Sequence, residues 1–152
     1  MNLYSWEGVG YNSVLDIEFN DGVITEPVTL TEAKDFCKVD IGTDDTLITA
    51  LITAARQQCE AYTAVGFVPH DAVAILNNTN GDIYIPYGPM IEINQVTDQD
   101  GNVLVLDTDY TLSGNQFKRL LTPRLKNITI DYITGYDELP NVLKTALLNQ
   151  IY

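Results

Sequence analysis

The sequence predicts an α+β fold in which a small helical layer carries an inserted antiparallel β-module of about six strands. Three observations support this class. Apolar residues recur at helical spacing in residues 27–66, alternate with polar residues over residues 67–136, and return to helical spacing in residues 137–152. Consecutive strands with hairpin-length links are typical of α+β rather than α/β proteins.

The first helix is predicted from a capping box. Thr29 lies three residues before Glu32. Its hydroxyl can accept the Glu32 N–H, while the Glu32 carboxylate can accept the Thr29 N–H. Apolar side chains then follow at helical spacing at Leu30, Ala33 and Cys37. We therefore expect a short capped helix as the first half of a helical hairpin over residues 27–66.

The second helix of the hairpin is predicted to begin at Asp44 and Asp45, whose carboxylates can accept the free N–H groups and complement the helix dipole. The apolar stripe of this helix contains Leu47, Ile48, Leu51, Ile52, Ala55, Cys59 and Tyr62. The opposite stripe contains Thr46, Thr49, Thr53, Arg56, Gln57 and Glu60. This division predicts an amphipathic helix that packs through its apolar stripe.

Residues 1–26 are predicted to form an N-terminal β-hairpin extension to a main domain of residues 27–152. Apolar and polar residues alternate up to Phe19, and Asn20-Asp21-Gly22 supplies turn residues before Val23 and Ile24. In the β-module the strands are expected near residues 73–76, 83–85, 91–96, 103–106, 110–112, 117–121 and 128–133. Hairpin turns are expected at Asn80-Gly81, Asp100-Gly101, Ser113-Gly114-Asn115 and Pro123.

The last helix is predicted to start at Pro140, because proline at the first helical position leaves no N–H without a partner. One face of this helix is apolar and contains Val142, Leu143, Ala146, Leu147 and Ile151. No segment reaches the roughly 18 consecutive apolar residues of a membrane span, so we expect no membrane insertion.

The chain is acidic, with 21 acidic and 8 basic residues and a formal net charge of −13. Such a chain does not bind the phosphate backbone by charge neutralisation, but it suits a wall that DNA slides past. The exception is a basic cluster around Pro123, predicted to lie on a hairpin and to face either DNA or an acidic neighbouring subunit. Its members are Lys118, Arg119, Arg124 and Lys126.

The sequence offers no recognisable chemistry. It contains no Gly-rich phosphate loop, no Ser-His-Asp set and no metal-ligand spacing. Cys37 and Cys59 are expected to be buried thiols, and His70, which follows Pro69, is expected in a surface turn. Residues 98–102 have the carboxylate spacing of a calcium loop, but Val103 stands where that loop needs glycine, so a β-turn is favoured. We expect no catalytic residue, no cofactor and no bound metal, and therefore no enzyme.

Three segments of the sequence, taken in order, form a recognisable pattern. The first is VTLTEAKDFCKVD with DDTLITALITAARQQCEAYT, a capped helix, an acidic pair and an Ala-rich helix. The second is PYGPMIEINQVTDQDGNVL, a Gly-Pro followed by strand, turn and strand. The third is ITIDYITGYDELPNVLKTALL, a strand that ends in Thr-Gly-Tyr before a Pro-started helix. Together these segments resemble the head–tail connector (adaptor) proteins of tailed bacteriophages, and the N-terminal extension departs from that family's pattern.

The resemblance implies a structural virion protein at the neck, assembled in the host cytoplasm. It implies a homo-oligomeric ring, a dodecamer, below the portal protein, with a neck stopper or tail protein on the other side and DNA passing through the lumen without sequence-specific binding. The alternative is another neck or tail protein, either a channel stopper or a glycan- or receptor-binding module, for which the nine tyrosines and Trp6 would supply stacking surfaces.

Contacts within the ring and with the portal are expected from the helical hairpin, the basic cluster and the last helix. For the basic cluster, an acidic copy of the same chain is favoured over DNA because the pair would be self-complementary in a ring. The expected interface residues are Leu47, Leu51, Arg56, Lys118, Arg119, Arg124, Lys126, Leu143, Leu147, Ile151 and Tyr152.

Overall fold

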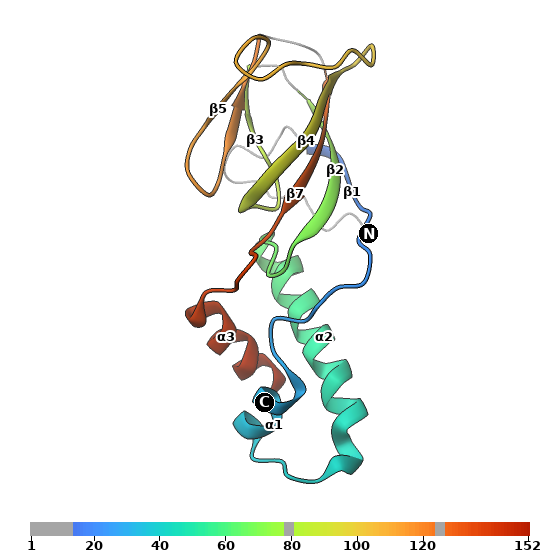
Figure 1. Ribbon diagram of the computed structural model, residues 1–152, viewed down its shortest axis with the longest axis vertical. Helices are drawn as coiled ribbons and strands as arrows, with labels where there is room; N and C mark the ends of the chain where they lie inside the picture. The colour runs from blue at the N-terminus through green and yellow to red at the C-terminus, as the bar shows by residue number, and fades with distance from the viewer. Residues whose placement is uncertain (1–13, 78–80, 124–126) are drawn as a thin grey trace.

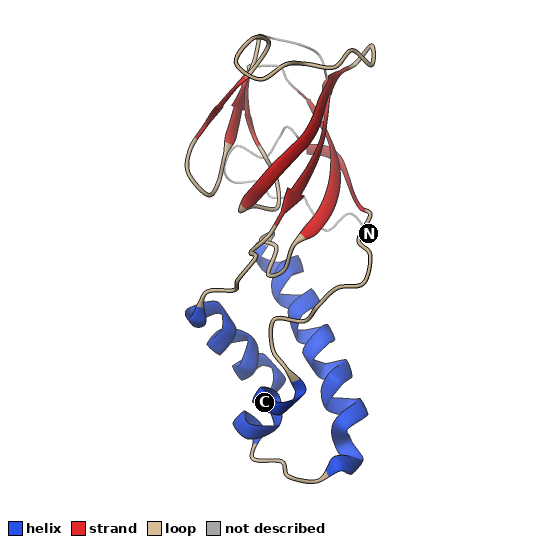
Figure 2. Cartoon of the chain, viewed as in Figure 1, coloured by secondary structure: helices blue, strands red, loops and turns tan. Residues whose placement is uncertain are grey.

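The computed structural model describes residues 14–77, 81–123 and 127–152. In these residues the chain forms three α-helices at one end of an elongated molecule and seven β-strands at the other. Figures 1 and 2 show the helical layer and the sheets stacked along the long axis, with the chain crossing between them in three places. The predicted α+β class, with a β-module inserted into a helical layer, is confirmed.

The helical layer consists of α1 (Leu30–Cys37), α2 (Asp45–Thr63) and α3 (Asn141–Ile151), with a short 3₁₀ turn, η1 (Gly42–Asp44), before α2. The capping box of α1 is confirmed. The Glu32 N–H donates to Thr29 Oγ1 at 3.2 Å, and the Thr29 N–H donates to Glu32 Oε2 at 2.8 Å. The buried core of this layer comes from all three helices and their flanks: Val28, Ala33, Ile48, Ile52, Ala55, Phe67, Leu139, Leu147 and Ile151.

The predicted capping of α2 by an acidic pair is wrong in its detail. Asp44 occupies the N-cap position but its side chain makes no capping hydrogen bond within the described residues. Asp45 instead accepts from Lys34 Nζ at 2.5 Å. The 3₁₀ turn before α2 and the nearby lysine of α1 explain the difference, because an ammonium ion is a stronger partner for a carboxylate than a backbone N–H.

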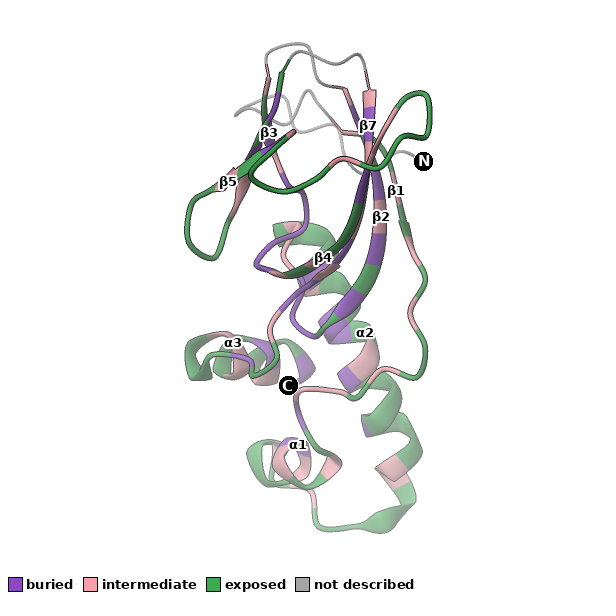
Figure 3. Ribbon diagram, turned by 45° about the horizontal axis from the view of Figure 1, so that its top comes forward, coloured by how far each residue is buried: buried purple, intermediate pink, exposed green. Residues whose placement is uncertain are grey.

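The strands form two antiparallel sheets. One has the order β1-β2-β7-β4 and consists of β1 (Val14–Phe19), β2 (His70–Asn77), β7 (Asn127–Thr134) and β4 (Met90–Asp98). The other has the order β3-β6-β5 and consists of β3 (Asp82–Tyr84), β6 (Arg119–Leu121) and β5 (Thr111–Ser113). Both sheets contribute to one core, in which Leu76, Ile128, Ile130, Tyr132, Ile83 and Leu120 are fully enclosed. Figure 3 shows this burial following β2 and β7 down to the helical layer.

The predicted N-terminal β-hairpin is wrong. β1 pairs with β2, with Phe19 opposite Ala72 and Ile17 opposite Ala74, and residues 20–29 run on toward the helices as an extended segment. The turn residues are used as anchors instead: the Asn20 N–H donates to the Asp71 carbonyl at 2.8 Å. An isolated two-stranded hairpin is marginally stable in water, so pairing with a longer strand of the main sheet is favoured.

One further strand prediction and two hairpin-turn predictions need correction. Residues 103–106 make only isolated bridges, because the carboxylate of Asp109 accepts the Val105 N–H at 2.8 Å and Asp107 adopts a positive φ, which folds the segment into a loop. The turns expected at Asn80-Gly81 and at Pro123 are not hairpin turns, because β2 and β3, like β6 and β7, belong to different sheets. Asn80 itself lies outside the described residues. The hairpin predicted around Gly114 is confirmed as β5–β6.

Two glycines meet where the chain passes between the helices and the sheets. Gly66 lies between α2 and β2, and Gly135 lies between β7 and α3. A Cβ on Gly66 would lie 2.8 Å from the Gly135 Cα, and a Cβ on Gly135 would lie 1.9 Å from the Val68 carbonyl oxygen. Gly135 also has a φ of +107°, which residues with side chains rarely adopt. Glycine is therefore required at both positions. We call this region, where the chain passes between the helical layer and the sheets, the waist.

Candidate functional site

The apolar stripe predicted for α2 divides into a buried and an exposed part. Ile48, Ile52 and Ala55 are buried against the other helices. Leu47 and Leu51 remain 60% and 40% exposed. The buried face is therefore rotated relative to the predicted one, so that it also contains the polar residues Arg56 and Glu60.

Several exposed apolar side chains belong to the helical layer, on α1, on and just before the first half of α2, and after α3 (Figure 1 shows these elements). Tyr152 is 86% exposed, and its ring meets the ring of Phe36 edge-on with centroids 6.4 Å apart. We call these exposed side chains together the distal apolar patch, and it consists of Phe36, Ile41, Leu47, Leu51 and Tyr152.

Several residues expected at the interface are instead inside the subunit. Leu147 has no exposed surface and Ile151 is buried, and both belong to the core of the helical layer. Leu143 is half-buried and packs against the same core. The apolar face of α3 is thus used by the subunit's own helices, with which Leu147 and Ile151 share one core.

Arg56 is buried in an ion-pair network rather than exposed. Its Nε donates to Glu26 Oε2 at 2.8 Å, and its Nη1 donates to Glu60 Oε2 at 2.6 Å. Burial lowers the pKa of Arg56, but the hydrogen bond that Arg56 donates to Glu26 and the negative charges of Glu60 and Glu26 outweigh it, so the pKa is raised. Glu26 lies thirty residues earlier in the chain, so helical periodicity could not reveal this partner.

His70 is also buried, against the prediction of a surface turn. It is the first residue of β2 and is 5% exposed. Its Nδ1 lies 2.6 Å from Asp21 Oδ2, and its Nε2 lies 2.9 Å from Glu60 Oε1. Burial lowers the pKa of His70, but the hydrogen bonds and charges of Glu60 and Asp21 outweigh it, so the pKa is raised above its usual 6.5. Together with the pairs of Arg56, these contacts form a continuous charged network across the waist.

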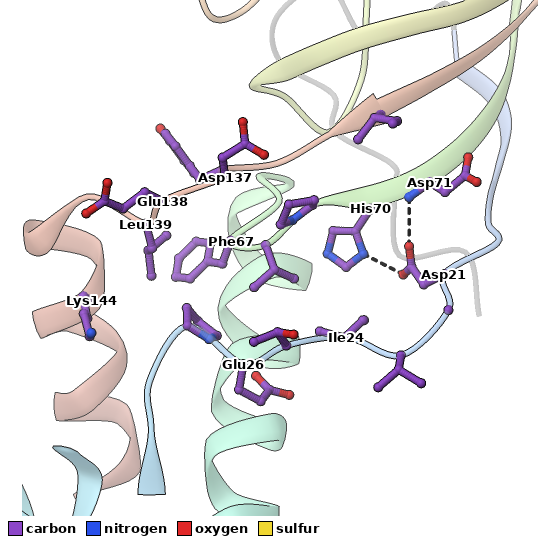
Figure 4. Close-up of a pocket in the computed structure, with 18 of the residues that line it drawn as sticks. Asp21, Ile24, Glu26, Phe67, His70, Asp71, Asp137, Glu138, Leu139 and Lys144 are labelled. Atoms are coloured by element: carbon purple, nitrogen blue, oxygen red, sulfur yellow. Dashed lines mark hydrogen bonds and ion pairs between the residues drawn. The ribbon is translucent and has the colours of Figure 1, made fainter. Parts of the chain in front are cut away.

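A cleft of about 620 Å³ lies beside this network. Figure 4 shows it bounded by the N-terminal segment with Asp21 and Glu26, by the α2–β2 connection with Phe67 and His70, and by the chain that leads into α3. Its walls mix apolar side chains with carboxylates, among them Asp137 and Glu138. The figure shows the Asp21 carboxylate reaching both His70 and the backbone of Asp71, which ties the N-terminal segment to β2.

The basic cluster is only partly described by the structure. Arg119 binds both carboxylate oxygens of Asp82, and its guanidinium lies 4.7 Å from the centre of the Tyr84 ring. Lys118 is half-buried. Arg124 and Lys126 lie outside the described residues. The charge of Arg119 is therefore balanced within its own subunit.

The remaining predicted groups have structural roles in the described part of the chain. The Asp98 carboxylate accepts the N–H groups of Asp100 and Asn102 at 2.9 and 2.8 Å, which is a turn within the loop. Cys37 and Cys59 are free and half-buried, and burial raises the pKa of the Cys59 thiol. Among residues 14–77, 81–123 and 127–152, no group of three or more His, Cys, Asp or Glu side chains is arranged to hold a metal ion. No helix in these ranges has the length and apolar character needed to cross a membrane.

Comparisons with solved structures match the fold to particles of a gene transfer agent (GTA). A chain in a structure described as the neck of the empty GTA particle, computed with C6 symmetry, superposes with a TM-score of 0.72 at 16% identity, over 90% of this chain and 82% of that one. A chain in the virion of the native gene transfer agent particle gives 0.71 at 17% identity, over 89% and 81%. A third, from the neck of the native particle computed with C12 symmetry, gives 0.57 at 16% identity, over 88% and 80%.

A search of curated proteins found no match. At the level of sequence families, the phage gp6-like head-tail connector protein family matches residues 27–103, which is 77 of the 152 residues and so just over half of the chain. The match begins two residues before the capping threonine of α1 and covers both helices of the hairpin, β2, β3 and β4. The chain therefore belongs to the phage gp6-like head-tail connector protein family.

Proposed function

We propose that this connector protein forms a homo-oligomeric ring in the virion neck, below the portal protein, and that the ring joins head to tail while DNA passes through its centre. The observation that carries the proposal is the distal apolar patch. Aromatic and aliphatic side chains remain in water there, although the helical layer has a complete core of its own. Phe36 and Tyr152 form an exposed aromatic pair, and Leu47 and Leu51 are exposed four residues apart on α2. Exposed apolar groups of this kind are typical of a protein–protein contact.

A ring needs a contact between two different faces of the subunit, because a head-to-tail interface closes by rotation. The patch supplies one face, on the helical layer. The family assignment and the likeness to chains in particles with sixfold and twelvefold symmetry support a ring, and a dodecamer is the stoichiometry we propose. Leu47 and Leu51 are the residues of the hairpin that we expect to face the neighbouring subunit.

The net charge of −13 supports passage of DNA rather than binding. A lumen lined by such subunits repels phosphate groups at every position, so DNA slides without being held. Lys118 and, beyond the described residues, Arg124 and Lys126 would meet the acidic surface of the next subunit. Complementary charge of this kind fixes register between neighbouring subunits.

Two further exposed apolar regions fit different partners. The start of α3 exposes Val142, which is outside the distal apolar patch, and we assign this part of the helical layer to the portal side. At the opposite end, the loop after β4 exposes Val103, Val105 and Leu106. Its own hydrogen bonds hold this loop in place, since the Val105 carbonyl accepts the Asp109 N–H at 2.8 Å. We assign it to the neck stopper or tail protein.

The test is assembly of particles that carry Leu47→Asp with Leu51→Asp. Because both side chains are exposed, the isolated variant should keep its thermal stability within about 0.5 kcal/mol. We expect it to be absent from the neck of particles seen by electron microscopy, and infectivity to fall. Gln57→Asp, also exposed on α2, adds one negative charge outside the patch, half of what the double variant adds, and should assemble normally. A double variant that is found at the neck of infectious particles would refute the proposed contact.

A further inference from the structure

The two ring nitrogens of His70 both contact carboxyl oxygens. A neutral imidazole has one donor and one acceptor, whereas an imidazolium ion has two donors. Glu60 Oε1 also accepts the Phe67 N–H at 2.8 Å, and Asp21 Oδ1 accepts the Asp71 N–H at 2.9 Å, so both carboxyl groups already act as acceptors. This arrangement favours a ring that donates from both nitrogens, which is the protonated form of His70.

The groups around His70 belong to different parts of the fold. Asp21 comes from the N-terminal segment and Glu60 from α2, where it is also paired with Arg56. Arg56 in turn holds Glu26 of the N-terminal segment. Three carboxylates and two cations thus lie in one chain of contacts, which has a net charge of −1 when His70 is protonated and −2 when it is neutral.

The other sides of the His70 ring are closed by apolar groups. The rings of Phe19 and Tyr87 lie 5.3 and 5.8 Å from it, centre to centre, and Gly66 approaches its Cδ2 atom. Asp71, the next residue of β2, is exposed and points its backbone N–H rather than its side chain at Asp21. Loss of the proton would therefore leave one of the two carboxyl groups facing a ring nitrogen that no longer donates a hydrogen bond.

We propose that residues 14–27 form a strap that is fastened across the waist by protonated His70 and loosens when His70 loses its proton. The strap contains β1 and the segment that carries Asp21 and Glu26. The contact between His70 and Asp21 is the one that breaks. Glu60 is 3% exposed and has two further partners, whereas Asp21 is 18% exposed and belongs to the strap itself. Release of the strap would uncover the edge of β2 and the wall of the cleft.

The sign of the pH dependence follows from linkage. The raised pKa of His70 means that the fastening is complete below pH 6.5, the usual pKa of the side chain, and is lost as the pH rises through the raised value. For each unit by which the pKa of His70 in the fastened state exceeds its value in the released state, the equilibrium for opening the strap increases about tenfold on deprotonation. The titration of His70 and the opening of the strap can therefore be measured independently, and the two must agree.

The experiment uses the full chain. His70 is the sole histidine in the sequence, so its carbon-bound ring protons give an unambiguous NMR titration. Amide exchange, corrected for its intrinsic pH dependence, gives the opening of β1 at each pH. We expect the protection factors of β1 to fall about tenfold per unit of pKa elevation across the His70 titration, while those of β4 and β7 stay constant.

Variants separate the strap from general destabilisation. Asp21→Asn keeps the shape of the side chain and removes its charge, so it should lower the pKa of His70 and reduce β1 protection even at pH 6. Asp45→Asn removes an ion pair of the helical layer that does not involve the strap and should change neither quantity. Unchanged β1 protection through the His70 titration, or an equal loss in β1, β4 and β7, would overturn the proposal.

Discussion

Glu60 is the residue whose loss should damage the subunit most without touching its apolar core. Its side chain accepts from Arg56 Nη1 at 2.6 Å, from His70 Nε2 at 2.9 Å and from the Phe67 N–H at 2.8 Å, and it is 3% exposed. Glu60→Ala would leave a buried guanidinium with one partner in place of two, a buried imidazole with one, and a buried N–H with none among the contacts described.

The expected cost is about 3–5 kcal/mol, the range for removing one partner of a buried ion pair. This figure exceeds the roughly 1 kcal/mol of an ordinary hydrogen bond, because the cations that remain have no access to water. For a domain of about this size, each kcal/mol shifts Tm by about 2–4 °C, so we expect a fall on the order of 6–20 °C.

Thermal unfolding followed by circular dichroism, with urea titration as a second measurement, gives the change in stability. Gln57→Ala, which removes an exposed polar side chain from the same helix, is the matched control and should stay within about 0.5 kcal/mol. A second comparison is Glu60→Gln, which keeps the volume and one acceptor oxygen and should cost less. If Glu60→Ala costs under about 1 kcal/mol, the network is not the buried charged connection that its geometry indicates.

Three other substitutions test separate parts of the fold. Gly135→Ala should lower the free energy of unfolding in urea by at least about 3 kcal/mol, because the added Cβ would collide with a carbonyl oxygen. Gly101 also has a positive φ but has open space around it, so Gly101→Ala should cost only about 1 kcal/mol. Equal costs for the two variants would contradict the close approach at Gly135. The pKa of Glu32 is lowered from 4.5 to about 2, mainly by its hydrogen bond with Lys144 of α3 and by its hydrogen bonds with Thr29, the N-cap residue of α1. Its stabilising effect should therefore be complete above pH 4.5 and disappear as the pH falls through about 2, so that acid unfolding curves of wild type and Glu32→Gln converge at low pH and separate above it. Leu147→Ala should lower stability by about 2–5 kcal/mol through a core cavity, and Val142→Ala, exposed on the same helix, by less than about 0.5 kcal/mol; similar values would mean that α3 does not pack as described.

Local sequence signals predicted the parts of the fold that depend on neighbours in the chain. Thr29 and Glu32 are three residues apart and form the predicted capping box. Gly114, between β5 and β6, marks a true hairpin. Both signals work because the atoms that interact are brought together by one turn of backbone, whatever the rest of the molecule does.

The waist could not be predicted because its residues interact across large separations in sequence. His70 and Asp21 are 49 residues apart, and Arg56 and Glu26 are 30 apart. A polar residue on a helix is normally assigned to the solvent side, and only a partner from another segment makes burial favourable. Nothing in the spacing around Arg56 or Glu60 signals that such partners exist, so the helix was assigned the wrong buried face.

Periodicity alone could not define the distal apolar patch. Leu47 and Leu51 belong to the apolar stripe that the sequence predicts on α2, but periodicity cannot divide a stripe between the subunit's own core and a surface. Leu147 and Ile151 look the same in sequence and lie inside. The division depends on how α3 docks on α1 and α2, which is a property of the tertiary structure.

The close approach of Gly66 and Gly135 has a mechanical consequence. The backbones on either side of it, from α2 into β2 and from β7 into α3, touch without intervening side chains, and β2 and β7 are the two central strands of their sheet. Because no side chain separates the two crossings, a rotation of the helical layer relative to the sheets should be transmitted through this backbone contact.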